Sequence, residues 1–198
     1  MGTLAQFKPL PVPSQFQWAL SHAQKNGPNV VREAFKTYGL KETVGSKHTP
    51  EILEMAEKLG GVIASFYTAD EIPWCGLGVS YWLKMAGATP PKDYSQVRAR
   101  DFAAWGNPAH RPSFGDVLVF WRGSKTGRDG HVGLYICETP EAYFVLGANQ
   151  GNAVSIAPLS KDRLLAARRI PWKIAQPSGV RPFLINSSGK VSLSENEA

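Results

Sequence analysis

Cys75 has the clearest setting for nucleophilic chemistry in this sequence. It follows Pro73 and Trp74 at the predicted start of a helix. Unpaired backbone N–H groups and the positive end of the helix dipole favour the thiolate form there, and they can also stabilise an oxyanion. The alternative interpretation is structural, because a free cysteine is commonly a small core hydrophobe. The structural interpretation is favoured for Cys137, which lies within an apolar strand pattern.

His131 is the candidate base for such a nucleophile. Of the four histidines in the sequence, it alone opens a predicted strand. Gly133 lies on the same face of an extended strand and leaves space beside the imidazole. Alternatively, a histidine at a strand end is a surface residue held by hydrogen bonds. His22, His48 and His110 fall in a polar helix or in loops, and no role is predicted for them.

A cysteine–histidine pair usually needs a third polar group that fixes the orientation and tautomer of the imidazole. If the strand from His131 forms a hairpin with the next strand, a three-residue loop over Thr139–Glu141 places Asn149 opposite the histidine. A four-residue loop places Ala148 there instead. Gln150 is the polar neighbour of the Asn149 candidate. In the alternative interpretation, both residues simply belong to a turn, where asparagine is common.

The elements that must position these side chains fall into two groups along the chain. Helical patterns come first, and strand patterns follow after Gly106. Because strands and helices do not alternate, the order predicts an α+β domain with an antiparallel sheet. The predicted helices are Gln15–Gln24, Val30–Tyr38, Pro50–Leu59, Cys75–Met85 and the short Asp101–Trp105. The predicted strands are Asp116–Trp121, His131–Cys137, Ala142–Leu146, Ala153–Ala157 and Leu164–Ile170.

A single catalytic domain is expected over residues 14–176. Three prolines keep residues 1–13 extended as an arm. Residues 177–198 grow polar and serine-rich, so a C-terminal tail is expected there, with the option of an edge strand over Val180–Ile185.

Composition and charge limit the class of protein. The 198 residues are 43% hydrophobic and 19% charged, which is an ordinary globular composition. The net charge of +6 is compatible with nucleic acid, with an acidic polymer such as the cell wall, or with solubility alone. No basic helix or aromatic RNA-reading motif supports nucleic-acid binding. No stretch approaches the roughly 20 apolar residues of a membrane span. The N-terminal residues do not resemble a signal peptide, so synthesis in the cytoplasm is expected.

Six motifs occur in an order that belongs to a known family. Together they resemble a bacterial and phage group of small papain-like cell-wall hydrolases, related to the NlpC-type peptidases and the CHAP amidases. The resemblance covers the chain from about Phe35 to Arg169. The motifs are DEIPWCGLGVSYWLKMAG, ARDFAAWG, GDVLVFWRG, GHVGLYIC, VLGANQGNAVSIAPL and RLLAARR.

The resemblance implies a papain-like fold, with the nucleophile at a helix N-terminus packed on an antiparallel sheet. It makes Cys75 the nucleophile and His131 the base. The polar residue of the family's GNQ stretch falls on Asn149, although many NlpC-type relatives carry a second histidine in the third role. Trp74 and Gln150 are the candidate substrate-binding residues, with a core position as the alternative for Trp74.

The implied activity is cleavage of an amide bond of peptidoglycan by thiol catalysis, as an endopeptidase or an amidase, with no cofactor or metal. One alternative is a zinc amidase with His110, His131 and Cys75 as ligands. Another is a non-catalytic wall-binding or phage structural module of the same fold. Peptidoglycan is the expected partner, and neither nucleic acid nor membrane insertion is expected. We expect a monomer that acts at the cell wall as a phage lysin, an injected effector or a virion component. A holin or secretion apparatus would deliver it, and an immunity protein is a further possible partner.

Overall fold

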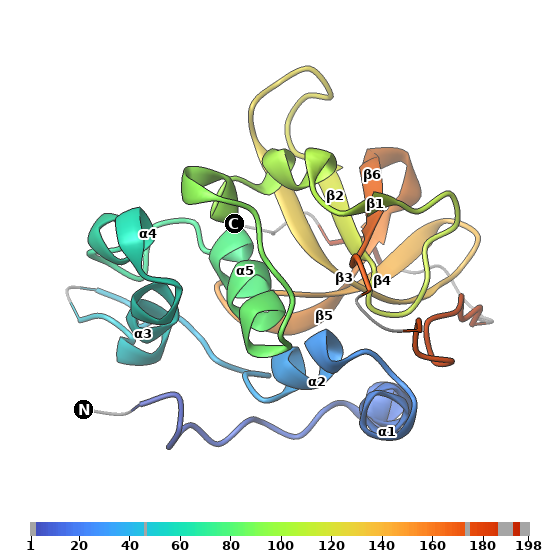
Figure 1. Cartoon of the computed structure of the whole chain (residues 1–198), viewed down its shortest axis with the longest axis horizontal. Helices are drawn as coiled ribbons and strands as arrows, with labels where there is room; N and C mark the ends of the chain where they lie inside the picture. Colours follow the sequence, from blue (N-terminus) through green and yellow to red (C-terminus); the bar gives the residue numbers. More distant parts are fainter. Residues whose placement is uncertain (1–2, 46, 173–174, 186–191, 195–198) are drawn as a thin grey trace.

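The structure is a computed structural model that describes residues 3–45, 47–172, 175–185 and 192–194. Apart from one short 3-10 helix between the last two strands, helical elements come first along the chain and strands second (Figure 1), which confirms the predicted α+β class. The helical elements are η1 (Ser14–Phe16), α1 (Gln17–Lys25), α2 (Asn29–Phe35), α3 (Pro50–Leu59), α4 (Gly61–Phe66), α5 (Cys75–Met85), η2 (Asp93–Gln96), η3 (Ala99–Ala104) and η4 (Lys161–Arg163), where η marks a 3-10 helix. The strands are β1 (Asn107–Pro108), β2 (Val117–Trp121), β3 (Gly130–Glu138), β4 (Ala142–Gly147), β5 (Ser155–Ser160) and β6 (Leu164–Arg169).

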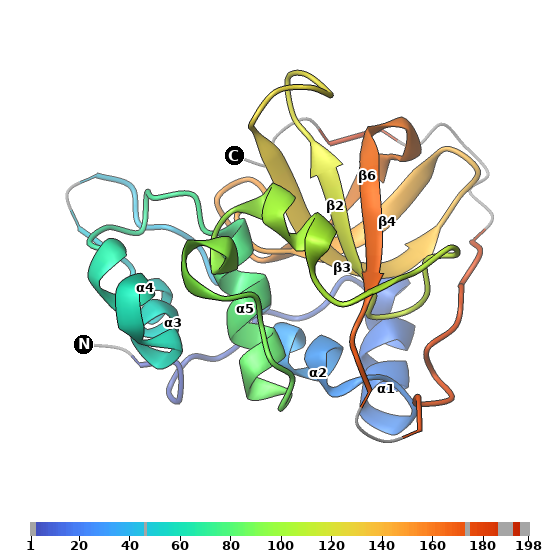
Figure 2. The same cartoon turned by 45° about the horizontal axis from the view of Figure 1, so that its top comes forward.

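The six strands form one antiparallel sheet in the order β1-β6-β2-β3-β4-β5. In both cartoon views, α5 lies between the sheet and the α3–α4 pair, with α2 beside it and α1 on the far side of α2 (Figures 1 and 2). Val132, Leu134 and Ile136 of β3 belong to the main core, which the helices share. Tyr135 belongs to a second apolar cluster with Leu118 and Phe120 of β2. Successive side chains of this strand therefore point to opposite faces of the sheet, as predicted, as far as Ile136.

Two glycines allow α5 to approach its neighbours closely. A Cβ atom at Gly76 would lie 2.6 Å from the carbonyl of Val97. A Cβ atom at Gly78 would lie 2.5 Å from the Cβ of Ala148. Since neither position has space for a side chain, the first turn of α5 rests directly on the segment before η3 and on the turn after β4.

The short helix α4 is absent from the sequence-based assignment. The pattern predicts that helical structure stops at the Gly60–Gly61 pair, whereas α4 begins at Gly61. Both glycines have positive φ, 78° and 55°. This backbone conformation suits glycine and turns the chain sharply between two helices, so the pair joins α3 to α4.

The β3–β4 hairpin contains a register shift that the predicted hairpin lacks. The shift lies between Tyr135 and Cys137, where Ile136 is the extra residue of a bulge. Cys137 consequently lies in the main core and does not share a face with Tyr135, contrary to the strict alternation of the prediction. The observed pairs are Leu134–Leu146 and Tyr135–Val145 before the bulge, and Cys137–Phe144 and Glu138–Tyr143 after it.

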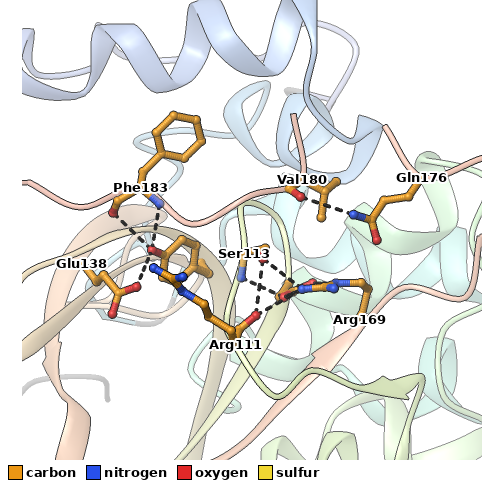
Figure 3. Close-up of polar contacts among 9 residues, drawn as sticks. Arg111, Ser113, Glu138, Arg169, Gln176, Val180 and Phe183 are labelled. Atoms are coloured by element: carbon orange, nitrogen blue, oxygen red, sulfur yellow. Dashed lines mark hydrogen bonds and ion pairs between the residues drawn. The ribbon is translucent and has the colours of Figure 1, made fainter. Parts of the chain in front are cut away.

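The segments outside the predicted domain pack against it where the structure describes them. In the N-terminal arm, Val12 is buried and the Leu10 amide donates to the Tyr38 carbonyl at 2.9 Å. Near the C-terminus, Phe183 lies beside Glu138, and the side-chain amide of Gln176 donates a hydrogen bond to the carbonyl of Val180 (Figure 3). The carbonyl of Phe183 accepts from the Glu138 amide at 2.9 Å.

The stretch predicted as a polar tail from residue 177 is therefore docked as far as residue 185. The edge-strand option there is reduced to one parallel bridge between Glu138 and Leu184. Residues 186–191 and 195–198 of that prediction lie outside the described residues.

Candidate active site

The thiol of Cys75 lies where α5 meets the beginning of β3. The helix begins at Cys75, as predicted, and the residue is only 5% exposed. The backbone N–H groups of Val132 and Gly76 lie near its sulfur and favour the charged form of the thiol. Val132 directly follows His131 in the chain. The predicted nucleophile therefore lies near the part of β3 that carries the predicted base.

Burial raises the pKa of the Cys75 thiol. The backbone N–H groups of Val132 and Gly76 and the positive charge of Arg122 act in the opposite direction, but they do not offset the burial. Burial therefore opposes the effect that the helix terminus is expected to have on the thiol. The physical reason is that this helix terminus lies inside the core, where desolvation disfavours the charged form.

The imidazole of His131 is fully buried and is held by Gln150. Its Nε2 atom lies 3.1 Å from the Oε1 atom of Gln150. The amide nitrogen of Gln150 donates to the carbonyls of Ser155 at 2.7 Å and Val145 at 3.2 Å. Because carbonyl oxygens only accept, the orientation of the Gln150 amide is fixed. The Nε2 atom of His131 must then be the donor, which leaves the lone pair of the neutral imidazole on Nδ1.

Gly147 provides the space in which this contact forms. A Cβ atom at position 147 would lie 2.9 Å from His131 Nε2 and 2.7 Å from Gln150 Oε1. The contact between the imidazole and the amide thus depends on a residue without a side chain at the end of β4.

The side chain of Asn149 bonds Glu42 and Trp74, whereas the sequence predicts that it faces His131. Asn149 has a positive φ of 57°. With its amide in the orientation that satisfies both neighbours, it donates to Glu42 Oε1 at 3.0 Å and accepts from the Trp74 backbone amide at 3.3 Å. Strand pairing between β3 and β4 ends at Leu134, before His131, and the left-handed conformation turns the chain. Strand geometry therefore does not extend to position 149, and Gln150 reaches the imidazole in its place.

Trp74 is fully buried in the main core. Its indole nitrogen donates to Glu42 Oε1 at 2.6 Å. The structure thus gives this tryptophan the core position that the sequence left open, and does not place it at a surface that meets substrate. Gln150 is also nearly covered, and its amide is occupied by His131, Ser155 and Val145.

Glu42 is a residue of this site to which the sequence assigned no role. One of its carboxylate oxygens accepts from both Trp74 and Asn149. It therefore links the residue before Cys75 to the residue before Gln150. The segment that carries it runs antiparallel to residues 152–154, with the Glu42 amide donating to the Asn152 carbonyl at 3.0 Å. Burial raises the pKa of Glu42, the bond from Trp74 lowers it, and nearby Asp70 raises it, with a net upward shift.

Asp70 holds the loop that follows Glu42. Its Oδ2 atom accepts from the backbone amides of Thr43 at 3.0 Å and Thr49 at 2.8 Å, and its Oδ1 atom lies 3.0 Å from His48 Nδ1. Burial alone would raise the pKa of Asp70, but these hydrogen bonds outweigh it and the pKa is lowered. This carboxylate is therefore structural, and it fixes the base of the segment that carries Glu42.

Metal-ligating side chains are not gathered in the described part of the chain. No group of three histidine, cysteine, aspartate or glutamate side chains is placed there to hold a metal ion. His110, His131 and Cys75, the ligands of the zinc alternative, thus do not converge.

Comparisons with known proteins give a limited result. No protein-family model matches the sequence, and no curated protein matches it. Among solved structures, the fold is similar to a Staphylococcus aureus subsp. aureus Mu50 protein described as similar to a lipoprotein of the NLP/P60 family. The TM-score is 0.45 at 17% sequence identity, over 84% of this chain. The chain spans 45% of the length of that protein. In the described residues, no helix is long and apolar enough to cross a membrane.

Proposed function

We propose that the protein is a cysteine peptidase or amidase that cleaves an amide bond of peptidoglycan. The observation that carries this proposal is the position of Cys75 at the start of α5, in a cleft that is also lined by Gly130, the residue before His131, whose imidazole is oriented by Gln150. A thiol at a helix N-terminus, a base and an orienting group are the three parts that thiol-dependent acyl transfer requires.

In this mechanism, the thiol attacks as its proton leaves. Burial favours the protonated form of the Cys75 thiol, and neutral Gln150 provides no negative charge to stabilise an imidazolium. We therefore expect His131 Nδ1 to take the thiol proton while the sulfur–carbon bond forms. The backbone N–H groups at the start of α5 stabilise the oxyanion.

The histidine next returns this proton to the leaving amine as the carbon–nitrogen bond breaks. Water then attacks the thioester carbonyl and gives its proton to His131, which releases the carboxylic acid and restores the thiol. Gln150 takes the orienting role that the sequence assigned to Asn149. Asn149 and Glu42 act behind it as positioning residues.

Peptidoglycan is proposed as the substrate because of the ordered motifs around Cys75 and His131, and because the net charge of +6 suits an anionic envelope. Both an endopeptidase and an amidase are compatible with this chemistry. We propose that the protein acts at the cell wall without a cofactor, as a lysin or an effector. A holin or a secretion apparatus would deliver it.

Mass spectrometry of products released from purified sacculi tests the proposal. The wild-type protein should release fragments with new amino termini or freed stem peptides, and Cys75→Ala should release none. Cys137→Ser is the matched control: it removes the other thiol, and it should retain activity at a cost of about 1–2 kcal/mol of stability from the buried hydroxyl.

Release by Cys75→Ala at the wild-type rate would refute thiol catalysis. Binding of the wild-type protein to sacculi without any release would instead favour a non-catalytic wall-binding module.

A further inference from the structure

A cleft of about 640 Å³ opens beside Cys75, and its walls carry an excess of positive charge. Cys75 and Pro73 form one side of it, and Arg122 with the loop between β2 and β3 forms another. A cleft of this size accommodates a small ligand or one to two residues of a peptide. The charged residues that line it are Arg98, Arg100, Arg122, Arg128, Asp101 and Asp129.

The lining charges differ in what they do. Arg100 donates to the carbonyls of Asp129 at 2.8 Å, Lys125 at 3.0 Å and Ser124 at 2.8 Å, so it braces the loop that leads into β3. Asp101 accepts from the hydroxyl of Ser95, which does not line the cleft, at 2.8 Å. Arg100 and Asp101 thus have structural roles at the edge of the cleft.

Arg98 and Arg128 line the cleft and are exposed. Arg98 comes from the segment before η3, and Arg128 comes from the loop between β2 and β3. The guanidinium of Arg98 lies 5.8 Å from the centroid of the Tyr94 ring, a contact that limits its orientations. Arg122 and Cys75 line the same cleft, and the positive charge of Arg122 acts to lower the pKa of the thiol. A negative group in this cleft would therefore lie beside the carbonyl that Cys75 attacks.

We infer that this cleft binds a carboxylate of the substrate, so that the preferred substrate is an acidic peptide with a free carboxylate within about one residue of the scissile amide. This rests on the proposed function and deepens it. Guanidinium groups match carboxylates through paired charge-assisted hydrogen bonds, which Arg98 and Arg128 can supply from two different segments of the chain. The same peptide with that carboxylate converted to a carboxamide keeps its shape and loses its charge. It should therefore bind more weakly.

Binding in the Cys75→Ala background tests this inference without turnover. The probes are two stem peptides, one with its free carboxylate and one with the corresponding carboxamide, each titrated by calorimetry. We expect at least tenfold tighter binding of the free carboxylate. The double variant Arg98→Gln/Arg128→Gln should bind both peptides equally, and a rise in ionic strength should shrink the preference of the parent.

Lys92→Gln/Lys125→Gln is the matched control. It removes two positive charges from exposed positions close in sequence to the two arginines, and neither lysine lines the cleft. The control should retain the preference. Equal binding of both peptides by the parent, or an unchanged preference in the arginine double variant, would overturn the inference.

The outcomes for the inference and for the proposed function can be distinguished. If the wild-type protein hydrolyses sacculi through Cys75 but accepts both peptides equally, thiol catalysis stands and the carboxylate site is refuted. If the preference in binding is present but no hydrolysis occurs, the carboxylate site stands and the catalytic proposal fails.

Discussion

The Nε2 atom of His131 lies 3.1 Å from the Oε1 atom of Gln150, and the other end of that amide is held by the carbonyls of Ser155 and Val145. The amide is therefore an acceptor toward the imidazole, and the neutral histidine carries its proton on Nε2. This arrangement selects the tautomer whose Nδ1 can act as a base. It also means that the orienting group bears no charge.

Loss of the orienting amide should reduce the rate without abolishing it. We expect Gln150→Ala to lower kcat/KM by about 10- to 100-fold, equivalent to about 1.4–2.7 kcal/mol, because the imidazole loses its fixed tautomer. Ser155→Ala is a milder comparison, since it removes a hydroxyl that contacts Gln150 at 3.3 Å and leaves the backbone carbonyl that accepts from the amide at 2.7 Å. Steady-state kinetics on a soluble stem peptide measures both. A larger loss in Asn149→Ala than in Gln150→Ala would show that the orienting role belongs to Asn149, as the sequence predicts.

Glu42 should affect catalysis through position alone. Glu42→Ala leaves the buried Trp74 indole N–H without its acceptor, and we expect a loss of about 1–3 kcal/mol of stability. A fall in kcat with little change in KM should accompany it. Glu42→Gln retains an acceptor oxygen, so its stability and its kcat should both be close to those of the wild type. Glu71→Ala, which removes a nearby exposed carboxylate, should match the wild type. A purely structural role would be indicated if kcat per folded molecule stayed unchanged in Glu42→Ala.

The raised pKa of Cys75 predicts how its alkylation depends on pH. Because the thiolate is the reactive form, the rate with iodoacetamide should keep rising above pH 9, with no plateau near neutrality. Burial raises the pKa of Cys137 to about 12, so this second thiol should stay unlabelled over the same range. Intact-mass measurements on the wild type and on Cys75→Ala separate the two thiols. A plateau in the Cys75 rate below pH 7 would instead indicate a preformed thiolate–imidazolium pair.

Asp70 should contribute stability that depends on pH in a defined direction. Its pKa is lowered in the folded protein, so its contribution is present above the unfolded value of about 3.9 and is lost as the pH falls through the folded value. We expect Asp70→Asn to lower the free energy of unfolding by about 1–3 kcal/mol at pH 6, and by progressively less toward pH 3. Urea unfolding at several pH values measures this difference. A deficit that stayed constant down to pH 3 would contradict the assignment.

Local sequence signals predicted the elements that carry the nucleophile and the base. Apolar spacing and a closing glycine defined the helix from Cys75 to Met85, and strand alternation placed His131 at the start of β3. These features depend on residues close in the chain. The third residue did not follow, because strand pairing ends at Leu134–Leu146, where the predicted register still holds, and because Asn149 has a positive φ. Each of these is set by packing between distant segments.

The opposing effect of burial on the ionisation of Cys75 was hidden for a related reason. A helix N-terminus favours thiolate when it is solvated, but the degree of burial at that terminus is a property of the folded core. The role of Glu42 was likewise hidden, since its contacts with Trp74 and Asn149 join segments more than thirty residues apart. The carboxylate followed by a turn in KETVG was the available signal, but it does not identify the partner.

Rapid-quench intact-mass spectrometry tests the central claim most directly, because it detects the covalent intermediate. With a stem-peptide substrate, the wild-type protein should gain the mass of the acyl fragment early in the reaction, and peptide mapping should place that mass on Cys75. The adduct should decay with the rate of product formation, and it should be absent from Cys75→Ala. Turnover with no adduct on Cys75, or an adduct on another residue at the same rate, would contradict the account.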